Sequence, residues 1–252
     1  MKDLIISATT KYGKPQLWNY VESIDRCGFN GDKIMVVYEI DRNTIDYLKM
    51  RGWELYQFPL QGHIHMKRLI DIYSVLEQLD TEYRYVITTD VRDVVFQKNP
   101  SEYLENSLKS GILVSSENVL YKDEPWGMKN IREGFGELPL SRYQTERSCN
   151  VGVLAGEYKY IKDLLFLNYL ISQSGNTSHY TDQSSFNFLI HSNLVKGNVQ
   201  IEGFETNWAF QLGTRNHKNL IGYPDYELDD YYIVHQYDRW DIANERITKR
   251  YK

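Results

Sequence analysis

Residues 85–96 read YVITTDVRDVVF. The β-branched and aromatic residues predict a strand from Tyr83 to Thr88, and the polar residues after it predict a turn. Two carboxylates, Asp90 and Asp93, directly follow this strand and are three residues apart. Where the chain turns, both side chains can face one hard cation at the carboxyl end of the strand. The stretch therefore predicts a metal site at the edge of a sheet.

Strand and helix signals alternate on either side of this stretch. Apolar runs predict strands, and amphipathic segments with Pro near the start or Gly at the end predict helices. The expected strands cover 4–8, 33–38, 53–58 and 112–115, and the expected helices cover 15–27, 44–51, 65–79 and 101–109. The alternation predicts an α/β fold, in which right-handed crossovers place helices on both faces of a mostly parallel sheet. We expect ligands at the carboxyl ends of its strands.

The second half of the chain is less regular. Residues 116–148 are polar, rich in glycine and charge and without clear periodicity, which predicts a long loop with a functional role. A strand at 151–155, helices at 158–171 and 182–191, a strand at 231–234 and a polar tail are expected after it. No repeat or linker interrupts the pattern, so we interpret residues 1–252 as a single domain.

The composition narrows the range of possible functions. The chain has 252 residues, 42% of them hydrophobic, and a formal charge of −5. This charge offers no basis for binding nucleic acid or an anionic membrane, and a negative protein that handles a nucleotide needs a local cation. No run approaches the ~20 apolar residues of a transmembrane segment. Cys27 and Cys149 are far apart, which favours reduced thiols in a cytoplasmic protein over a dense disulfide framework and leaves a single disulfide as the alternative.

His235 is the expected third metal ligand. It directly follows an apolar strand, and two carboxylates with one imidazole suit Mn²⁺ better than Ca²⁺. Two alternative interpretations remain open. Asp90 can cap a turn with Arg92 as an ion-pair partner, and the pair Asp238 and Asp241 repeats the same spacing elsewhere.

Four segments together resemble motifs of the GT-A glycosyltransferases. They are TDVRDVVF (89–96), NVGV (150–153), TDQ (181–183) and the late His235, and the resemblance spans about residues 1–240. The DxxD form with a late histidine is similar to the glycosyltransferase domain of procollagen lysyl hydroxylases. It also resembles small glycosyltransferases of bacteria, algae and large DNA viruses. The resemblance implies a Rossmann-like GT-A domain, with a mostly parallel sheet flanked by helices and a nucleotide-sugar donor.

The resemblance also implies a role for each matching residue. In the family, the DxxD pair and the late histidine bind the metal, which assigns Asp90, Asp93 and His235 to Mn²⁺ or Mg²⁺. Asp182 matches an acidic position near the acceptor, where an inverting enzyme keeps its general base. The departure from the commoner DxD spacing leaves the division of roles between Asp90 and Asp93 open. Contacts to the nucleotide-sugar donor fall on Thr9, Thr10, Lys67, Asp90, Asn150 and Gly152.

These assignments have structural alternatives. Asp182 can cap the helix that it opens, and Asn150 and Gly152 can shape a turn before a strand. Lys67 can be an ordinary solvated helix residue.

The predicted function is metal-dependent transfer of a sugar from a nucleotide-diphosphate donor, with UDP as the expected carrier, to a hydroxyl of a carbohydrate acceptor. The expected enzyme is a hexosyl- or pentosyltransferase of glycan biosynthesis. A sugar-phosphate nucleotidyltransferase is one alternative, but it needs a Gly-rich phosphate loop where residues 7–14 read SATTKYGK. A non-catalytic carbohydrate-binding module on the same fold is another, and it predicts sugar binding without metal-dependent turnover.

Overall fold

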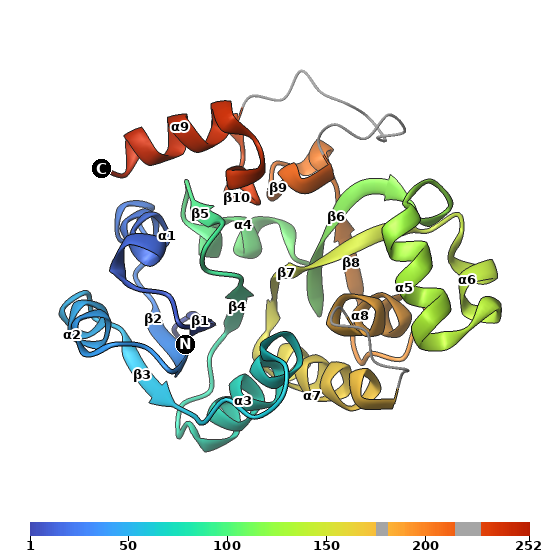
Figure 1. The fold of residues 1–252 in the computed structure, drawn as a ribbon, viewed down its shortest axis with the longest axis horizontal. Coiled ribbons are helices and arrows are strands. Elements are labelled where there is room, and N and C mark those ends of the chain that lie inside the picture. The colour runs from blue at the N-terminus through green and yellow to red at the C-terminus, as the bar shows by residue number, and fades with distance from the viewer. Residues whose placement is uncertain (175–180, 215–227) are drawn as a thin grey trace.

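The computed structural model describes residues 1–174, 181–214 and 228–252. Its main sheet contains β1 (Leu4–Thr10), β2 (Asp32–Tyr38), β3 (Glu54–Gln57), β4 (Tyr85–Thr89), β6 (Ile112–Leu120), β7 (Arg147–Glu157) and β8 (Val199–Glu202). The strand order is β3-β2-β1-β4-β7-β6-β8 (Figure 1). β7 runs antiparallel to β4 and β6, and the other neighbouring pairs are parallel. The predicted α/β fold with a mostly parallel sheet is confirmed.

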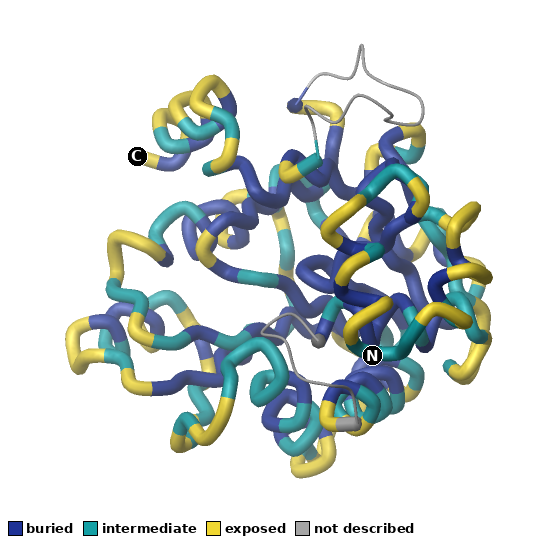
Figure 2. Tube along the Cα trace, turned by 45° about the vertical axis from the view of Figure 1, so that its right-hand side comes forward, coloured by how far each residue is buried: buried dark blue, intermediate teal, exposed yellow. Residues whose placement is uncertain are grey.

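Helices cover both faces of this sheet because its strands bury side chains on both sides. Leu4 and Ile6 belong to one hydrophobic core and Ile5 to the other, as the two-residue period of a strand requires. The first core receives α3 (Ile64–Gln78), α7 (Tyr158–Ser174) and α8 (Thr181–His191). The second receives α1 (Lys14–Arg26), α2 (Arg42–Met50) and α4 (Pro100–Ser107). Figure 2 shows the buried strands at the centre and the exposed residues on the outer turns of the helices.

A second, three-stranded sheet lies beside the second core. It consists of β5 (Val94–Phe96), β10 (Ile233–His235) and β9 (Ala209–Gln211), in the order β5-β10-β9. β10 is antiparallel to β5 and parallel to β9. The prediction of a polar tail after the last strand is wrong, because α9 (Asp241–Arg250) buries Ala243 and Ile247 against this sheet.

Residues 116–148 are not the irregular loop that their composition predicts. β6 continues to Leu120, and α5 (Pro125–Phe135) and α6 (Glu137–Tyr143) follow before β7 begins. The two helices pack around Ile131, Leu140 and Tyr143, with Phe188 of α8 against them. In α5, Met128, Ile131 and Phe135 do follow a helical spacing, but only over three turns and among glycine and charged residues, so the composition of the whole stretch conceals it. Single-turn 3₁₀ helices cover Tyr121–Asp123, Phe204–Thr206, Leu212–Thr214, Leu228–Asp230 and Tyr237–Arg239.

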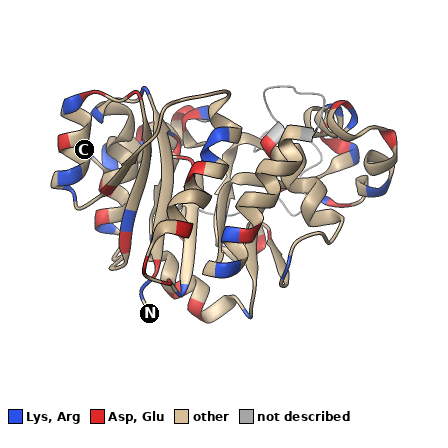
Figure 3. Cartoon of the chain, turned by 90° about the horizontal axis from the view of Figure 1, so that it is seen from below, with Lys and Arg blue, Asp and Glu red and all other residues tan. Residues whose placement is uncertain are grey.

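The surface carries charges of both signs. Figure 3 shows lysine, arginine, aspartate and glutamate interspersed over the outer helices, while the central strands are largely free of them. Within the described ranges, every helix is too short or too polar to traverse a membrane.

The packing of α5 and α6 predicts a stability effect. Ile131 is fully buried, so Ile131→Ala should lower the free energy of unfolding by about 2–4 kcal/mol through lost burial and an unfilled cavity. Leu138→Ala is the matched control, because Leu138 on α6 is 65% exposed and its truncation should cost little. Urea denaturation followed by circular dichroism measures both variants. Equal losses in the two would contradict the packing of this subdomain.

Candidate metal and donor site

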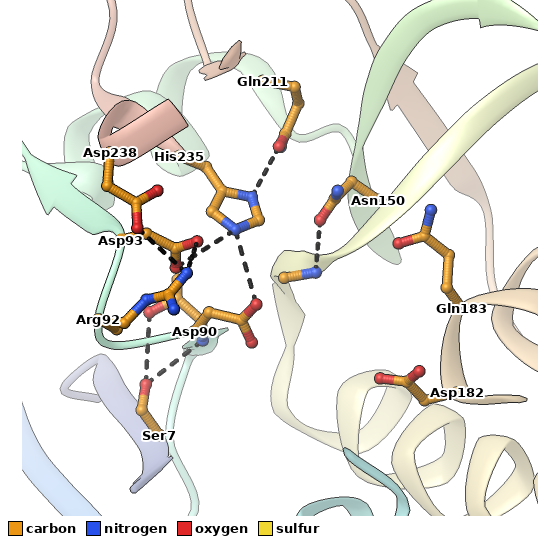
Figure 4. A network of polar contacts seen from close by, with 12 residues as sticks. Ser7, Asp90, Arg92, Asp93, Asn150, Asp182, Gln183, Gln211, His235 and Asp238 are labelled. Carbon is orange, nitrogen blue, oxygen red and sulfur yellow. Dashed lines mark hydrogen bonds and ion pairs between the residues drawn. The ribbon is translucent and has the colours of Figure 1, made fainter. Parts of the chain in front are cut away.

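Asp90, Asp93 and His235 meet at the carboxyl end of β4. One ligand atom from each lies within 4.8 Å of the others. His235 Nε2 is 3.6 Å from Asp90 Oδ2 and 3.7 Å from Asp93 Oδ1, and all three side chains point to one centre (Figure 4). These separations are too long for hydrogen bonds, but they suit ligand atoms that surround a shared ion at ~2.1 Å.

Backbone pairing holds the three side chains together. The β5–β10 register places His235 opposite Val94, the residue after Asp93. The next residue, Gln236, donates its N–H to the Asp93 carbonyl at 2.7 Å. Asp90 donates its own N–H to the carbonyl of Gly152 at 2.9 Å, which continues the β4–β7 ladder past Thr89. The site is therefore fixed by two ladders that meet at the Asp90–Asp93 turn.

Gln211 orients the imidazole of His235. The β9–β10 register pairs the two residues, and Gln211 Oε1 lies 2.7 Å from His235 Nδ1. An Nδ1–H that donates to this carbonyl oxygen leaves the lone pair on Nε2, as metal-ligating histidines require. Nε2 is buried and has no hydrogen-bond partner among the described residues.

Gly152 leaves the space that an ion needs. A Cβ atom at this position would lie 2.4 Å from His235 Cε1 and 2.8 Å from Asp90 Oδ2. Any side chain would therefore push into the centre of the triad. Two carboxylates, one free imidazole nitrogen and an open space beside them fit a divalent cation that prefers oxygen and nitrogen ligands.

Arg68 connects the triad to Asp182. From α3, its guanidinium forms a close ion pair with Asp90 and donates to Asp182 Oδ2 from Nη2 at 3.2 Å. Burial opposes ionisation of Asp90, but Arg68 and His235 outweigh it and lower the pKa of that carboxyl. Burial raises the pKa of Asp182 despite the same guanidinium. The two acids flanking Arg68 thus differ in their affinity for a proton.

Glu117 organises the other wall of the site. It is buried near the end of β6 and its Oε1 accepts from Asn150 Nδ2 at 2.8 Å and from Gln183 Nε2 at 3.4 Å. Its Oε2 accepts from the Ser148 hydroxyl at 2.9 Å. Asn150 in turn accepts the N–H of Gly152 at 2.7 Å through its side-chain oxygen. One buried carboxylate thereby fixes the amides of Asn150 and Gln183.

Two adjoining cavities open beside the triad. Their volumes are about 370 Å³ and about 210 Å³. Asp90 lines both, His235 lines the larger and Asp93 lines the smaller. The wall that the two cavities share is formed by His65, Arg68, Asp90, Gln236 and Arg239.

The predicted donor contacts fall into both cavities, with one exception. Thr9 and Thr10 line the smaller cavity, and their buried hydroxyl oxygens have no hydrogen-bond partner among the described residues. Asn150 and Gly152 line the larger cavity, as does the predicted base Asp182. These residues line the two adjoining cavities, and their contacts with a donor or an acceptor stay predictions.

Lys67 is the exception. Its ammonium pairs with Asp71 on the same helix, and Asp71 also accepts the Tyr38 hydroxyl at 2.7 Å. Lys67 is not among the residues that line either cavity. Its placement does not support a contact with the donor, because one step along the helix turns the neighbouring Arg68 toward the site instead.

Sequence reasoning did not single out Arg68, Glu117, Gln211 or Arg239. Arg68 had a usable signal, since it shares the helical phase of the buried Ile72 and Val75, where a charge is unexpected. Glu117 lies within the long strand β6, Gln211 ends the short strand β9 and Arg239 ends a single 3₁₀ turn. Only the folded chain brings these three residues to the site.

The competing interpretations of the acidic pairs are also resolved in part. Arg92 does contact Asp93 at 3.4 Å, and it binds Asp238 at 3.1 Å. Within the described ranges, however, the Asp90, Asp93 and His235 cluster is the single group of three or more potential metal-binding side chains. Asp238 and Asp241 are not part of such a group.

Comparison with known proteins supports the fold. No known protein family matches the sequence, and no curated protein does. Among solved structures, the chain is similar to galactosyltransferase LgtC, which was crystallised with donor and acceptor sugar analogues. The TM-score is 0.62 at 15% identity, over 98% of this chain and 95% of that one. The predicted GT-A fold is confirmed, and the narrower resemblance to lysyl hydroxylases stays a prediction.

The space beside Gly152 predicts a test of the metal site. Gly152→Ala should weaken Mn²⁺ binding by about 10–100-fold, because the added methyl group displaces His235 and Asp90. Gly134→Ala is the control, since a Cβ there meets only Ser184 Oγ at 3.8 Å. Calorimetric titration with MnCl₂ measures both. A folded Gly152→Ala protein with unchanged Mn²⁺ affinity would show that the ion binds elsewhere.

Proposed function

We propose that this chain is a metal-dependent glycosyltransferase that moves a sugar from a nucleotide-diphosphate donor, with UDP as carrier, to a carbohydrate hydroxyl. One observation carries the proposal: the triad of Asp90, Asp93 and His235 stands where two cavities join. A diphosphate that links a nucleoside to a sugar has its negative charge at the corresponding point of the molecule. The GT-A fold supports the same interpretation.

The donor fits the two adjoining cavities in one orientation. The nucleoside enters the smaller cavity, where Thr9 and Thr10 offer hydroxyls and Tyr12 offers an aromatic ring. The diphosphate crosses the shared wall beside Arg68 and Arg239. The sugar then lies in the larger cavity against the amides that Glu117 fixes. A divalent cation in the triad, Mn²⁺ or Mg²⁺, supplies stabilisation of the charge that develops on the departing diphosphate.

The protein side chains perform the remaining tasks. Arg68 adds positive charge at the leaving group and keeps Asp90 ionised. Asp182 lines the sugar cavity, and its raised pKa suits a group that takes a proton from an acceptor hydroxyl. In a retaining reaction the same carboxylate has the lesser task of orienting the donor sugar.

The two alternative functions receive less support. The connection between β1 and α1 spans only residues 11–13, which is too short for the phosphate loop of a nucleotidyltransferase. A binding module without catalysis does not require a complete metal triad joined to a buried acid.

UDP release from UDP-galactose and UDP-glucose in the presence of Mn²⁺ tests the proposal. Wild type should release UDP, and a chelator should abolish the release. Asp182→Asn should lower kcat by about 100-fold while Mn²⁺-dependent UDP binding persists. Asp241→Asn, an exposed change at the start of α9, should behave as wild type.

The pH dependence of the reaction rate tests the same role of Asp182. A base acts only when deprotonated, so the rate should rise with pH through the raised pKa of Asp182 and fall on the acid side. Asp182→Asn should remove this acid limb. Full activity of Asp182→Asn would refute the role of Asp182 as the base. Turnover that a chelator does not reduce would refute the dependence on a metal ion.

A further inference from the structure

Gln236 is a nearly buried polar residue in the wall that the two cavities share. It directly follows His235, lines both cavities and is only 8% exposed. Its side-chain amide forms no hydrogen bond with the residues that the structure describes, yet neither amide atom is enclosed by protein. The open space that the amide reaches is therefore that of the cavities. A polar group so placed needs a partner there, which a ligand can provide.

The backbone at Gln236 does not call for a glutamine. Its φ is 60° and its ψ is 32°, in the left-handed region that glycine and asparagine occupy most easily. The hydrogen bond from its N–H to the Asp93 carbonyl fixes this conformation, and any residue with a backbone N–H could form it. The presence of a long amide at a strained position of the site thus points to a role for the side chain itself.

Gly213 provides the space into which this amide extends. A Cβ atom at Gly213 would overlap Gln236 Oε1 and would lie 2.9 Å from Arg239 Nη1. The φ of Gly213 lies outside the left-handed region, so space rather than backbone conformation favours glycine there. Gly213 lines the larger cavity but not the smaller one. The amide of Gln236 therefore lies on the side of the shared wall that faces the larger cavity.

We propose that Gln236 binds the β-phosphate of the donor, by donating a side-chain N–H to a phosphate oxygen. The inference rests on the proposed function, which places the nucleoside in the smaller cavity and the sugar in the larger one. The β-phosphate carries the sugar, so it lies on the same side of the shared wall as the amide. The amide can turn about its last side-chain bond to present its two N–H donors. A hydrogen bond to a charged phosphate is stronger than one between neutral groups.

Calorimetric titration of UDP and UMP at saturating MnCl₂ tests this in wild type, Gln236→Ala and Gln236→Gly. Both variants delete the amide and keep the backbone N–H that donates to Asp93. Both should bind UDP about 10–100-fold more weakly than wild type, as expected for the loss of a hydrogen bond to a charged group. UMP has no β-phosphate, so its Kd should agree within about twofold among the three proteins. The Kd of Mn²⁺ without nucleotide should also stay within about twofold.

The comparison of alanine with glycine separates binding from backbone strain. Gln236→Gly should have a higher Tm than Gln236→Ala, because glycine adopts a φ of 60° without steric cost. Their losses of UDP affinity should nevertheless be equal, because both lack the amide. Asn193 provides the matched control: it is exposed, has a φ of 53° and lines neither cavity. Asn193→Ala and Asn193→Gly should bind UDP as wild type does.

Three results would overturn the inference alone, provided that wild type binds UDP in a Mn²⁺-dependent manner. The first is wild-type UDP affinity in Gln236→Gly. The second is a loss of UMP affinity as large as that of UDP, which would exclude a contact specific to the β-phosphate. The third is an equal loss of Mn²⁺ affinity, which would show that Gln236 only positions His235 and Asp93. Wild type that does not bind UDP in the presence of Mn²⁺ would instead refute the proposed function, and the inference with it.

Discussion

The pairing of β5 with β10 is the constraint on which the candidate site depends. It brings His235 next to Asp93 although 141 residues separate them in the chain, and the Gln236 N–H fastens the two segments again at the Asp93 carbonyl. The small sheet in turn rests on a core that α9 completes. A chain segment that composition marks as a polar tail thus supports the geometry of the metal-binding side chains.

Electrostatics explains why such a site calls for a cation. Asp93, Glu117 and Asp182 are buried and Asp90 is partly buried, all around the same cavities. Arg68 compensates two of them, and hydrogen bonds from amides and a hydroxyl serve Glu117. Burying a carboxylate is costly unless it is paired, and a divalent ion between Asp90 and Asp93 would add to the charge that Arg68 and Arg92 already supply.

Much of the fold could be predicted from local patterns, because the spacing of apolar residues in the longer strands and helices is visible in the sequence. The DxxD pair was recognisable for the same reason, since it directly follows a strongly patterned strand. The short elements were not. β5, β8 and β9 have three or four residues each, and the helical spacing of α5 covers only three turns within a polar stretch. Glu117 and Gln211 are ordinary polar residues until strand pairing places them beside Asn150 and His235. Lys67 shows a further limit of prediction from the sequence. An error of one position along a helix changes which side chain faces the site.

The most direct test of the central claim is calorimetric titration of UDP with and without Mn²⁺. It should compare wild type, Asp93→Asn and Asp241→Asn, the last taken from the second DxxD-spaced pair. The account predicts UDP binding that requires Mn²⁺ in wild type and in Asp241→Asn, and that is lost in Asp93→Asn. UDP binding that is indifferent to both the metal and Asp93→Asn would contradict it.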